Sequence, residues 1–266
     1  MSAGDDASAD IAIKRAYQDG KLYKPSTICI EAERDAAEYT RRLLWEKMEM
    51  VRLHLKRSEL LVDLCCATGT HLLELAGHVD RALGLDFSEP FIEKAKQEAE
   101  TAGLDHIDFE LGDAKDLPLA DGSVGTLYSF SSLYVIPGVE EVVSEIARVL
   151  QPGGRCILDM GNARSLNSFC VRHYTEWPPS FPMPVHKIRS MLARHELTII
   201  EHRAFQLLPL WADRPGWLWP LLHPAWTSLM AKRIGERMLD ERLSNLPGLK
   251  NVAFRHMIVA ERQDRQ

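Results

Sequence analysis

Three aspartates, Asp63, Asp86 and Asp113, lie at or just after the ends of short apolar runs that predict buried strands. In an open sheet of parallel strands, ligands bind in the crevice outside the carboxyl ends of the strands. Ionised carboxylates there can accept hydrogen bonds from hydroxyl, amino or ammonium groups. The spacing of these acids therefore predicts a ligand site at one edge of a sheet.

The first aspartate is followed by a turn of small residues, Cys65-Cys66-Ala67-Thr68-Gly69, and then by a predicted helix that offers Leu72, Leu73 and Leu75 for burial. Small side chains in a turn let backbone N–H groups approach a ligand closely, and a helix N-terminus adds unpaired donors. This strand, turn and helix form the segment on which the predicted site depends.

Strands and helices alternate through most of the chain. Hydrophobic periodicity predicts strands at 60–64, 81–86, 106–111, 124–130, 155–160, 197–208 and 251–262. It predicts further helices at 11–23, 31–55, 88–102, 138–150 and 185–196. The alternation favours an α/β fold with a mainly parallel sheet covered by helices on both faces.

The first 55 residues are predicted to cover the site from one side. Residues 1–10 are small and acidic, which is typical of a disordered tail. The helix at 31–55 has an apolar face that is expected to pack against the sheet. On its solvent side the pattern places four charged residues: Arg41, Arg42, Glu46 and Lys47.

Composition narrows the classes of function. Apolar residues make up 45% and charged residues 26%, as in ordinary globular proteins, and the net charge of −6 disfavours a nucleic-acid partner. The five cysteines show no metal-binding spacing and no plausible disulfide framework, so we expect reduced thiols and a cytoplasmic protein without a metal. Neither a signal peptide nor a membrane-spanning run is apparent.

The motifs taken in series resemble those of class I S-adenosylmethionine-dependent methyltransferases. The matching segments are 62–69, 84–88, 112–114, 117–123 and 150–154, within a similarity that covers about residues 55–162. The paired cysteines are similar to the first motif of the quinone-pathway methyltransferases. The resemblance implies a Rossmann-like, seven-stranded, mostly parallel sheet whose last strand is antiparallel. It also implies S-adenosylmethionine as the cofactor and methyl transfer to a small molecule.

The resemblance implies roles for particular residues, and each has a structural alternative. Asp63 would attract the α-ammonium group of the cofactor, or would only organise the N–H groups of the turn. Asp86, 23 residues later (86 − 63), would accept from the ribose hydroxyls, or would be a charge favoured at a helix N-terminus. Asp113 would accept from the adenine amino group, or would belong to a common turn. The other expected cofactor-binding residues are Cys65, Ala67, Gly69, Phe87, Ala114 and Ser129.

Two other functions remain open. A dehydrogenase of the Rossmann type carries three glycines in its phosphate-binding turn, whereas this turn holds Cys65 and Ala67 at two of those positions. NAD binding is therefore the less favoured alternative. A regulatory or scaffold protein that binds S-adenosylmethionine without methyl transfer would carry the same cofactor residues.

The residues that would act on the acceptor are less apparent. Relatives often carry an acid at the start of the fourth strand, where this chain has Val124-Gly125. Tyr134 lies near positions where relatives carry histidines facing the acceptor, so it is a candidate base, hydrogen-bond donor or packed aromatic. His173 is a candidate general base or simply a solvated loop histidine.

The last third of the chain holds aromatic-rich segments that interrupt the alternation. We expect a methyltransferase domain at 56–266 with cap insertions at 161–184 and 209–250. The second insertion is predicted to include one helix with residues at every fourth position on its apolar side: Trp226, Met230, Ile234 and Met238.

The tryptophans of the second insertion fit a cap over the substrate, a homodimer contact or peripheral membrane contact through 215–240. The aromatic lining favours an acceptor with an apolar or ring portion. A quinone precursor, a natural product or a lipid-linked sugar, methylated on oxygen or carbon, would fit.

Overall fold

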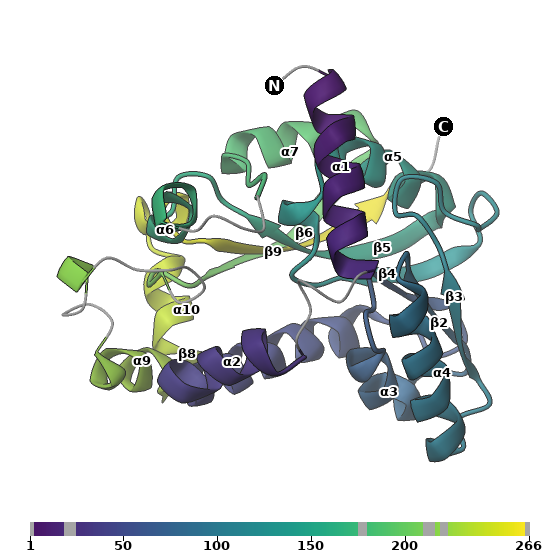
Figure 1. Ribbon diagram of the computed structural model, residues 1–266, viewed down its shortest axis with the longest axis horizontal. Helices are drawn as coiled ribbons and strands as arrows, with labels where there is room; N and C mark the ends of the chain where they lie inside the picture. Colours follow the sequence, from purple (N-terminus) through teal and green to yellow (C-terminus); the bar gives the residue numbers. More distant parts are fainter. Residues whose placement is uncertain (1–2, 19–24, 175–179, 210–215, 219–222, 264–266) are drawn as a thin grey trace.

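The computed structural model describes residues 3–18, 25–174, 180–209, 216–218 and 223–263, and a seven-stranded sheet runs through its centre (Figure 1). The strands are β1 (Leu61–Leu64), β2 (Ala82–Asp86), β3 (Ile107–Leu111), β4 (Val124–Ser129), β5 (Leu150–Gly161), β6 (Leu197–Phe205) and β9 (Arg255–Arg262). Their order across the sheet is β3-β2-β1-β4-β5-β9-β6.

The strand order reverses between β1 and β4. The strand β1 pairs in parallel with β2 on one side and with β4 on the other, so a crevice forms beyond the carboxyl ends of these strands. The strand β9 runs antiparallel to both β5 and β6. The predicted seven-stranded, mostly parallel sheet with an antiparallel last strand is confirmed.

Helices cover both faces of the sheet (Figure 1). The described helices longer than one turn are α1 (Ala3–Gln18), α2 (Pro25–His54), α3 (Thr70–Leu75), α4 (Glu89–Ala102), α5 (Val139–Val149), α6 (Leu166–Tyr174), α7 (Val185–Arg194), α9 (Pro224–Ala231) and α10 (Leu239–Ser244). One buried cluster joins α2, α3 and α4 to the sheet, and another joins α5 and α7 to its opposite face. This is the predicted two-sided covering.

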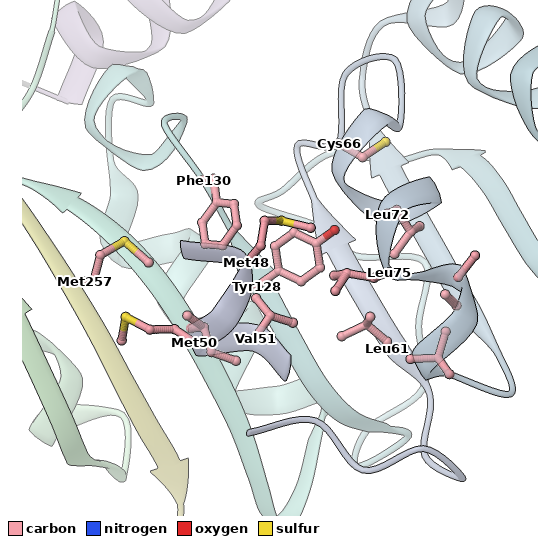
Figure 2. Close-up of a cluster of buried hydrophobic side chains, with 14 of the residues drawn as sticks. Met48, Met50, Val51, Leu61, Cys66, Leu72, Leu75, Tyr128, Phe130 and Met257 are labelled. Atoms are coloured by element: carbon pink, nitrogen blue, oxygen red, sulfur yellow. The ribbon is translucent and has the colours of Figure 1, made fainter. Parts of the chain in front are cut away.

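The helix α2 packs its apolar face into the centre of the first cluster. Figure 2 shows Met48, Met50 and Val51 of α2 lying between Tyr128 of β4, Met257 of β9 and the β1–α3 segment, and all of these side chains are buried. Burial of side chains of this size stabilises the fold by about 1.5–3 kcal/mol each. The predicted packing of this helix against the sheet is therefore observed.

The solvent side predicted for this helix was wrong at two positions. Glu46 and Lys47 are buried, with only 4% and 5% of their surface exposed. Lys47 lies one helical turn after Leu43, which follows Tyr39 by the same interval, so it continues a buried row of side chains. The charge of Lys47 had suggested exposure, but its helical position places it inside.

The N-terminus and the second insertion also differ from prediction. Residues 3–10, expected to be disordered, belong to α1, where Asp10 pairs with Lys14 at 3.0 Å and Ile13 is buried. The single helix expected around 226–238 is α9 followed by a small hairpin of β7 (Arg233–Ile234) and β8 (Arg237–Met238), then α10. Gly235 has a φ of 65° in the hairpin turn, which interrupts the helical pattern.

The described residues also form four short 3-10 helices. They are η1 (Ala76–His78), η2 (Leu133–Val135), which follows β4, η3 (Gly216–Leu218) and η4 (Leu249–Asn251). Within the described ranges, no helix is long and apolar enough to cross a membrane, and no three metal-ligating side chains come together.

Candidate active site

A cavity of about 330 Å³ opens beyond the carboxyl ends of the first four strands. Its floor is the turn after β1, and its walls come from the ends of β2, β3 and β4, while α1 and α2 lie over it. The predicted cofactor-binding residues that line it are Asp63, Cys65, Ala67, Asp86, Phe87, Asp113 and Ala114. The structure therefore brings residues from three separate strand ends into one cavity.

Asp86 organises the turn after β1. Its Oδ2 accepts a hydrogen bond from the Ala67 N–H at 2.9 Å, and its Oδ1 accepts from the Ser88 N–H at 3.0 Å. Burial raises the pKa of this carboxyl despite these two hydrogen bonds. Each carboxylate oxygen has two acceptor sites, so Asp86 can hold the turn and still accept from ligand hydroxyls.

The turn itself has an unusual backbone. Cys65 and Ala67 adopt positive φ angles of 62° and 47°, which non-glycine residues rarely do, and Gly69 has a φ of 74°. A Cβ on Gly69 would lie 2.5 Å from the ring of Phe109. Strained backbone of this kind persists where the surrounding structure holds it, and it clusters at ligand sites. Gly69 does not line the cavity itself, but its conformation allows the turn that does.

Asp63 is a buried carboxyl without a full set of hydrogen bonds. Only 2% of its surface is exposed, and its Oδ2 has no hydrogen-bond partner among the described residues. Its pKa is raised to about 7, mainly by burial; the Tyr128 hydroxyl beside it opposes this shift, and the nearby charge of Asp86 adds to it. A cationic ligand group would satisfy the orphaned oxygen and stabilise the ionised form.

Asp113 carries an ion pair from the N-terminal helix. Lys14 Nζ lies 2.5 Å from Asp113 Oδ2, and the Lys115 N–H donates to Oδ1 at 3.0 Å. Partial burial raises the pKa of Asp113, but the hydrogen bonds from Lys14 and Lys115 outweigh it and hold the pKa below its usual range. Asp10 and Ile13 of the same helix also line the cavity, so α1 closes this end.

The other end of the cavity holds a buried cluster of charges that sequence reasoning missed. Lys47 Nζ lies 2.6 Å from Asp159 Oδ2 and 3.2 Å from Ser131 Oγ. Arg255 Nη1 also donates to Asp159 Oδ2, and its Nε donates to Gln206 Oε1 at 2.9 Å. Lys47, Ser131 and Arg255 line the cavity, so two cations face it with one carboxylate behind them.

Burial and the charge of Arg255 lower the pKa of Lys47 to about 8, although Asp159 opposes this shift. The cluster lies next to the Phe130 ring, whose centroid is 5.3 Å from Lys47 Nζ. His71 packs edge-on against the same ring at 5.7 Å between centroids. Burial, followed by the charge of Lys47, lowers the pKa of His71 to about 4, so this imidazole is neutral at neutral pH.

The candidates for acceptor chemistry lie in different places. Tyr134 on η2 is outside the cavity lining, but its hydroxyl accepts a hydrogen bond from Arg255 Nη2 at 3.4 Å, which joins it to the charge cluster. His173 on α6 does not line the cavity and packs against Phe169, with 4.6 Å between ring centroids. Ser129 is the buried last residue of β4 and does not line the cavity either.

The missed residues had recognisable signals. Asp159 lies between Leu158 and Met160 inside a predicted strand, and Arg255 begins another after Phe254. A charged residue within an apolar strand is rarely buried unless it is paired. Two such residues of opposite sign in strands of one sheet predict a buried pair, although nothing local shows that the strands are neighbours.

The central part of the chain is similar to known proteins. Residues 62–158 match the family model described as "Methyltransferase domain". The demethylmenaquinone methyltransferase of Oceanobacillus iheyensis is 30% identical over 150 residues, which is 55% of this chain and 62% of that protein. The chain thus covers less than two thirds of the length of this curated relative.

Solved structures share the fold at low sequence identity. The YcgJ protein of Bacillus subtilis superposes with a TM-score of 0.58 at 16% identity, over 83% of this chain and 100% of that one. Geranyl diphosphate C-methyltransferase from Streptomyces coelicolor A3(2) gives 0.59 at 18% identity, over 84% and 80%. These similarities extend the shared architecture beyond the matched domain.

Proposed function

We propose that this chain moves a methyl group from S-adenosylmethionine to a small-molecule acceptor, because residues 62–158 match the model of a methyltransferase domain. The main support is that Asp63, whose buried Oδ2 has no hydrogen-bond partner in the part of the chain that the structure describes, lies beside Asp86 in one cavity. An amino-acid ammonium would pair with the first carboxylate, and ribose hydroxyls would donate to the second. The donor set therefore fits this cofactor.

The chain's own residues would orient the cofactor along the cavity. Asp63 would hold the ammonium group, Asp86 the ribose, and Phe87 with Ala114 the adenine ring, while Asp113 is already paired with Lys14. The bound cofactor supplies an electrophilic methyl carbon, to which the acceptor bonds as the carbon–sulfur bond breaks and leaves its electron pair on sulfur. Such a displacement requires alignment and the exclusion of water more than it requires covalent chemistry from the protein.

The acceptor is proposed to enter at the end that holds Lys47 and Phe130. Apolar side chains of α2 and η2 line this end, including Leu43, Leu44 and Val135, and they suit a ring or a hydrocarbon chain. The curated relative acts on demethylmenaquinone and the structural relative on geranyl diphosphate. A quinone precursor is the acceptor class that we propose first, and a prenyl diphosphate is the alternative.

Calorimetry and a transfer assay test the proposal in two steps. S-adenosylhomocysteine should bind, NADH should not, and a labelled methyl group should pass to a ring acceptor such as a demethylated naphthoquinol. Binding of NADH without binding of S-adenosylhomocysteine would overturn the cofactor and favour a dehydrogenase. Cofactor binding with no transfer to ring or prenyl acceptors would favour the regulatory or scaffold alternative.

The insertions are proposed to have a supporting role. The described residues of 161–184 and 209–250 do not line the cavity, so they would act by covering its entrance or by contacting a partner. Trp217 and Trp226 are exposed by 62% and 47%, which suits the proposed peripheral membrane contact or homodimer. Liposome flotation and size-exclusion chromatography, each with Trp217→Ser and Trp226→Ser variants, would separate these roles. We expect the protein to act in the cytoplasm.

A further inference from the structure

Two buried cations, Lys47 and Arg255, share one carboxylate, that of Asp159. Both cations are almost fully buried, at 5% and 2% exposure, and both donate to the same carboxylate oxygen, Asp159 Oδ2. Buried charges are normally compensated, because an unbalanced charge in a medium of low polarity is costly. A structural ion pair with Asp159 would need only one of the two cations.

Both cations face the cavity. Lys47, Ser131 and Arg255 line it, whereas Asp159 does not. The Lys47 ammonium has three N–H donors, and the described residues supply two acceptors, Asp159 Oδ2 and Ser131 Oγ. One donor of Lys47 thus remains for a ligand atom.

On the basis of the proposed methyl transfer, we infer that Lys47 and Arg255 bind the ionised hydroxyl oxygen of a phenol or enol acceptor. The one remaining donor of Lys47 suits a single oxyanion, whereas a diphosphate would bring two or more negative charges. The surrounding Phe130, Leu43 and Val135 suit the ring that carries such a hydroxyl. This assignment specifies the acceptor class beyond "ring or apolar portion".

Lys47 is also the proton acceptor in this assignment. Its pKa of about 8 leaves a fraction of the amine neutral at neutral pH. The O–H bond of the acceptor breaks, its electron pair stays on oxygen, and the proton joins the lone pair of Nζ to form the ammonium that then holds the oxyanion. Electron density from the oxyanion makes the oxygen, or the ring carbon beside it, a better nucleophile toward the methyl group.

The groups that face Lys47 from neighbouring elements determine its protonation state. Asp159 on β5 favours its charged form, while Arg255 on β9 and burial disfavour it. His71 on α3 is neutral, with its pKa at about 4, and Tyr134 on η2 is bound to Arg255 rather than to Lys47. No second carboxylate among the described residues contacts Lys47, so the oxyanion would be the compensating charge.

The test uses 2-naphthol as the acceptor probe and ultraviolet difference spectra as the readout. In protein loaded with S-adenosylhomocysteine, bound 2-naphthol should ionise about 1–3 pH units below the ordinary phenol value of about 10. Lys47→Met should return the ionisation of bound 2-naphthol close to that value, and Lys47→Arg should keep most of the shift because it keeps the charge. Lys56→Met removes a lysine just past the same helix, where the side chain is 55% exposed, and should behave as the wild type.

Several results would overturn the assignment. Wild-type protein that binds 2-naphthol in its neutral form, or not at all, would do so, as would an unchanged shift in Lys47→Met. Tight binding of 2-naphthoate without binding of 2-naphthol would make the ligand a carboxylate. The binding of S-adenosylhomocysteine to the wild type and to each variant is measured in parallel by calorimetry. Cofactor binding with neutral 2-naphthol refutes only the oxyanion site, whereas absent cofactor binding in the wild type refutes the proposed function itself.

Discussion

Lys47 of α2 and Asp159 of β5 form a buried ion pair, with 2.6 Å between Nζ and Oδ2, although they lie 112 positions apart in the sequence. The same carboxylate oxygen accepts from Arg255 and from the Ser131 N–H. Asp159 therefore ties together α2, β9 and the segment after β4 at the end of the cavity where the acceptor is proposed to bind. Loss of the Asp159 carboxylate would therefore remove hydrogen bonds from all three elements.

Asp159→Asn should destabilise the fold strongly, because it leaves Lys47 and Arg255 buried without a counter-charge. We expect the free energy of unfolding in urea to fall by about 3–5 kcal/mol. The control is Asp121→Asn, whose exposed carboxylate pairs with Arg148 at 2.7 Å and should matter by less than about 1 kcal/mol. Equal losses in the two variants would show that the buried cluster is not held by its carboxylate.

Asp63→Asn should stabilise the ligand-free protein at high pH while weakening cofactor binding. The folded pKa of about 7 lies above the unfolded value of about 4, so the stability that Asp63 provides is complete below pH 4 and is lost as pH rises through 7. The variant avoids this loss, so the difference in its Tm from the wild type should grow from pH 4 to pH 8. A difference that does not change with pH would contradict the raised pKa.

The same carboxyl should make cofactor affinity depend on pH. Only the ionised form attracts an ammonium group, so the affinity of the wild type for S-adenosylhomocysteine should rise with pH up to about 7 and then level off. In Asp63→Asn this rise should disappear. Calorimetry at pH values from about 5.5 to about 8.5, a range that spans the ionisation of Asp63, measures the affinity of both proteins and checks both statements.

Asp86→Ala should weaken binding of S-adenosylhomocysteine by about tenfold or more, because it removes the ribose acceptor and two hydrogen bonds to backbone N–H groups. Asp108→Ala is the matched control, since Asp108 is exposed on β3 and lies outside the cavity lining. Calorimetry on both variants measures their affinity for S-adenosylhomocysteine. Unchanged affinity in Asp86→Ala would remove Asp86 from the site.

Gly69→Ala should cost more stability than Gly103→Ala. Both glycines have positive φ angles, 74° and 65°, and a Cβ in this region costs about 1–2 kcal/mol. Only at Gly69 would the new Cβ also meet the Phe109 ring at 2.5 Å, whereas nothing lies within 4 Å at Gly103. Thermal unfolding should rank the two variants in this order, and only Gly69→Ala should lower the affinity for the cofactor.

Local patterns in the sequence were sufficient to predict the central sheet and many of the residues that line the cavity. Alternation of apolar runs and amphipathic segments predicted the α/β layers, because each pattern reports how one element must bury its own face. Asp63, Asp86 and Asp113 could be placed together since the carboxyl ends of parallel strands share one edge of the sheet. These inferences need only residues close to one another in the chain.

The helices at the start of the chain and around Trp226 were not predicted correctly from local sequence patterns. The acidic start of the chain looked disordered, yet Lys14 of α1 reaches Asp113, which lies 99 residues away. The pattern around Trp226 looked helical until Gly235, where the hairpin depends on pairing between Arg233 and Met238. In both places a tertiary or cross-strand contact outweighed local propensity.

The sequence by itself determined the strand, the turn and the helix around Asp63, because spacing and small side chains limit that segment to few conformations. Only the tertiary structure decided that Lys47 faces inward and that Asp159 and Arg255 meet it. Hydrophobicity assigns a lysine to solvent, and no local signal shows that strands β5 and β9 are neighbours. The cofactor end of the site was therefore readable from the chain, while the proposed acceptor end depends on contacts between distant residues.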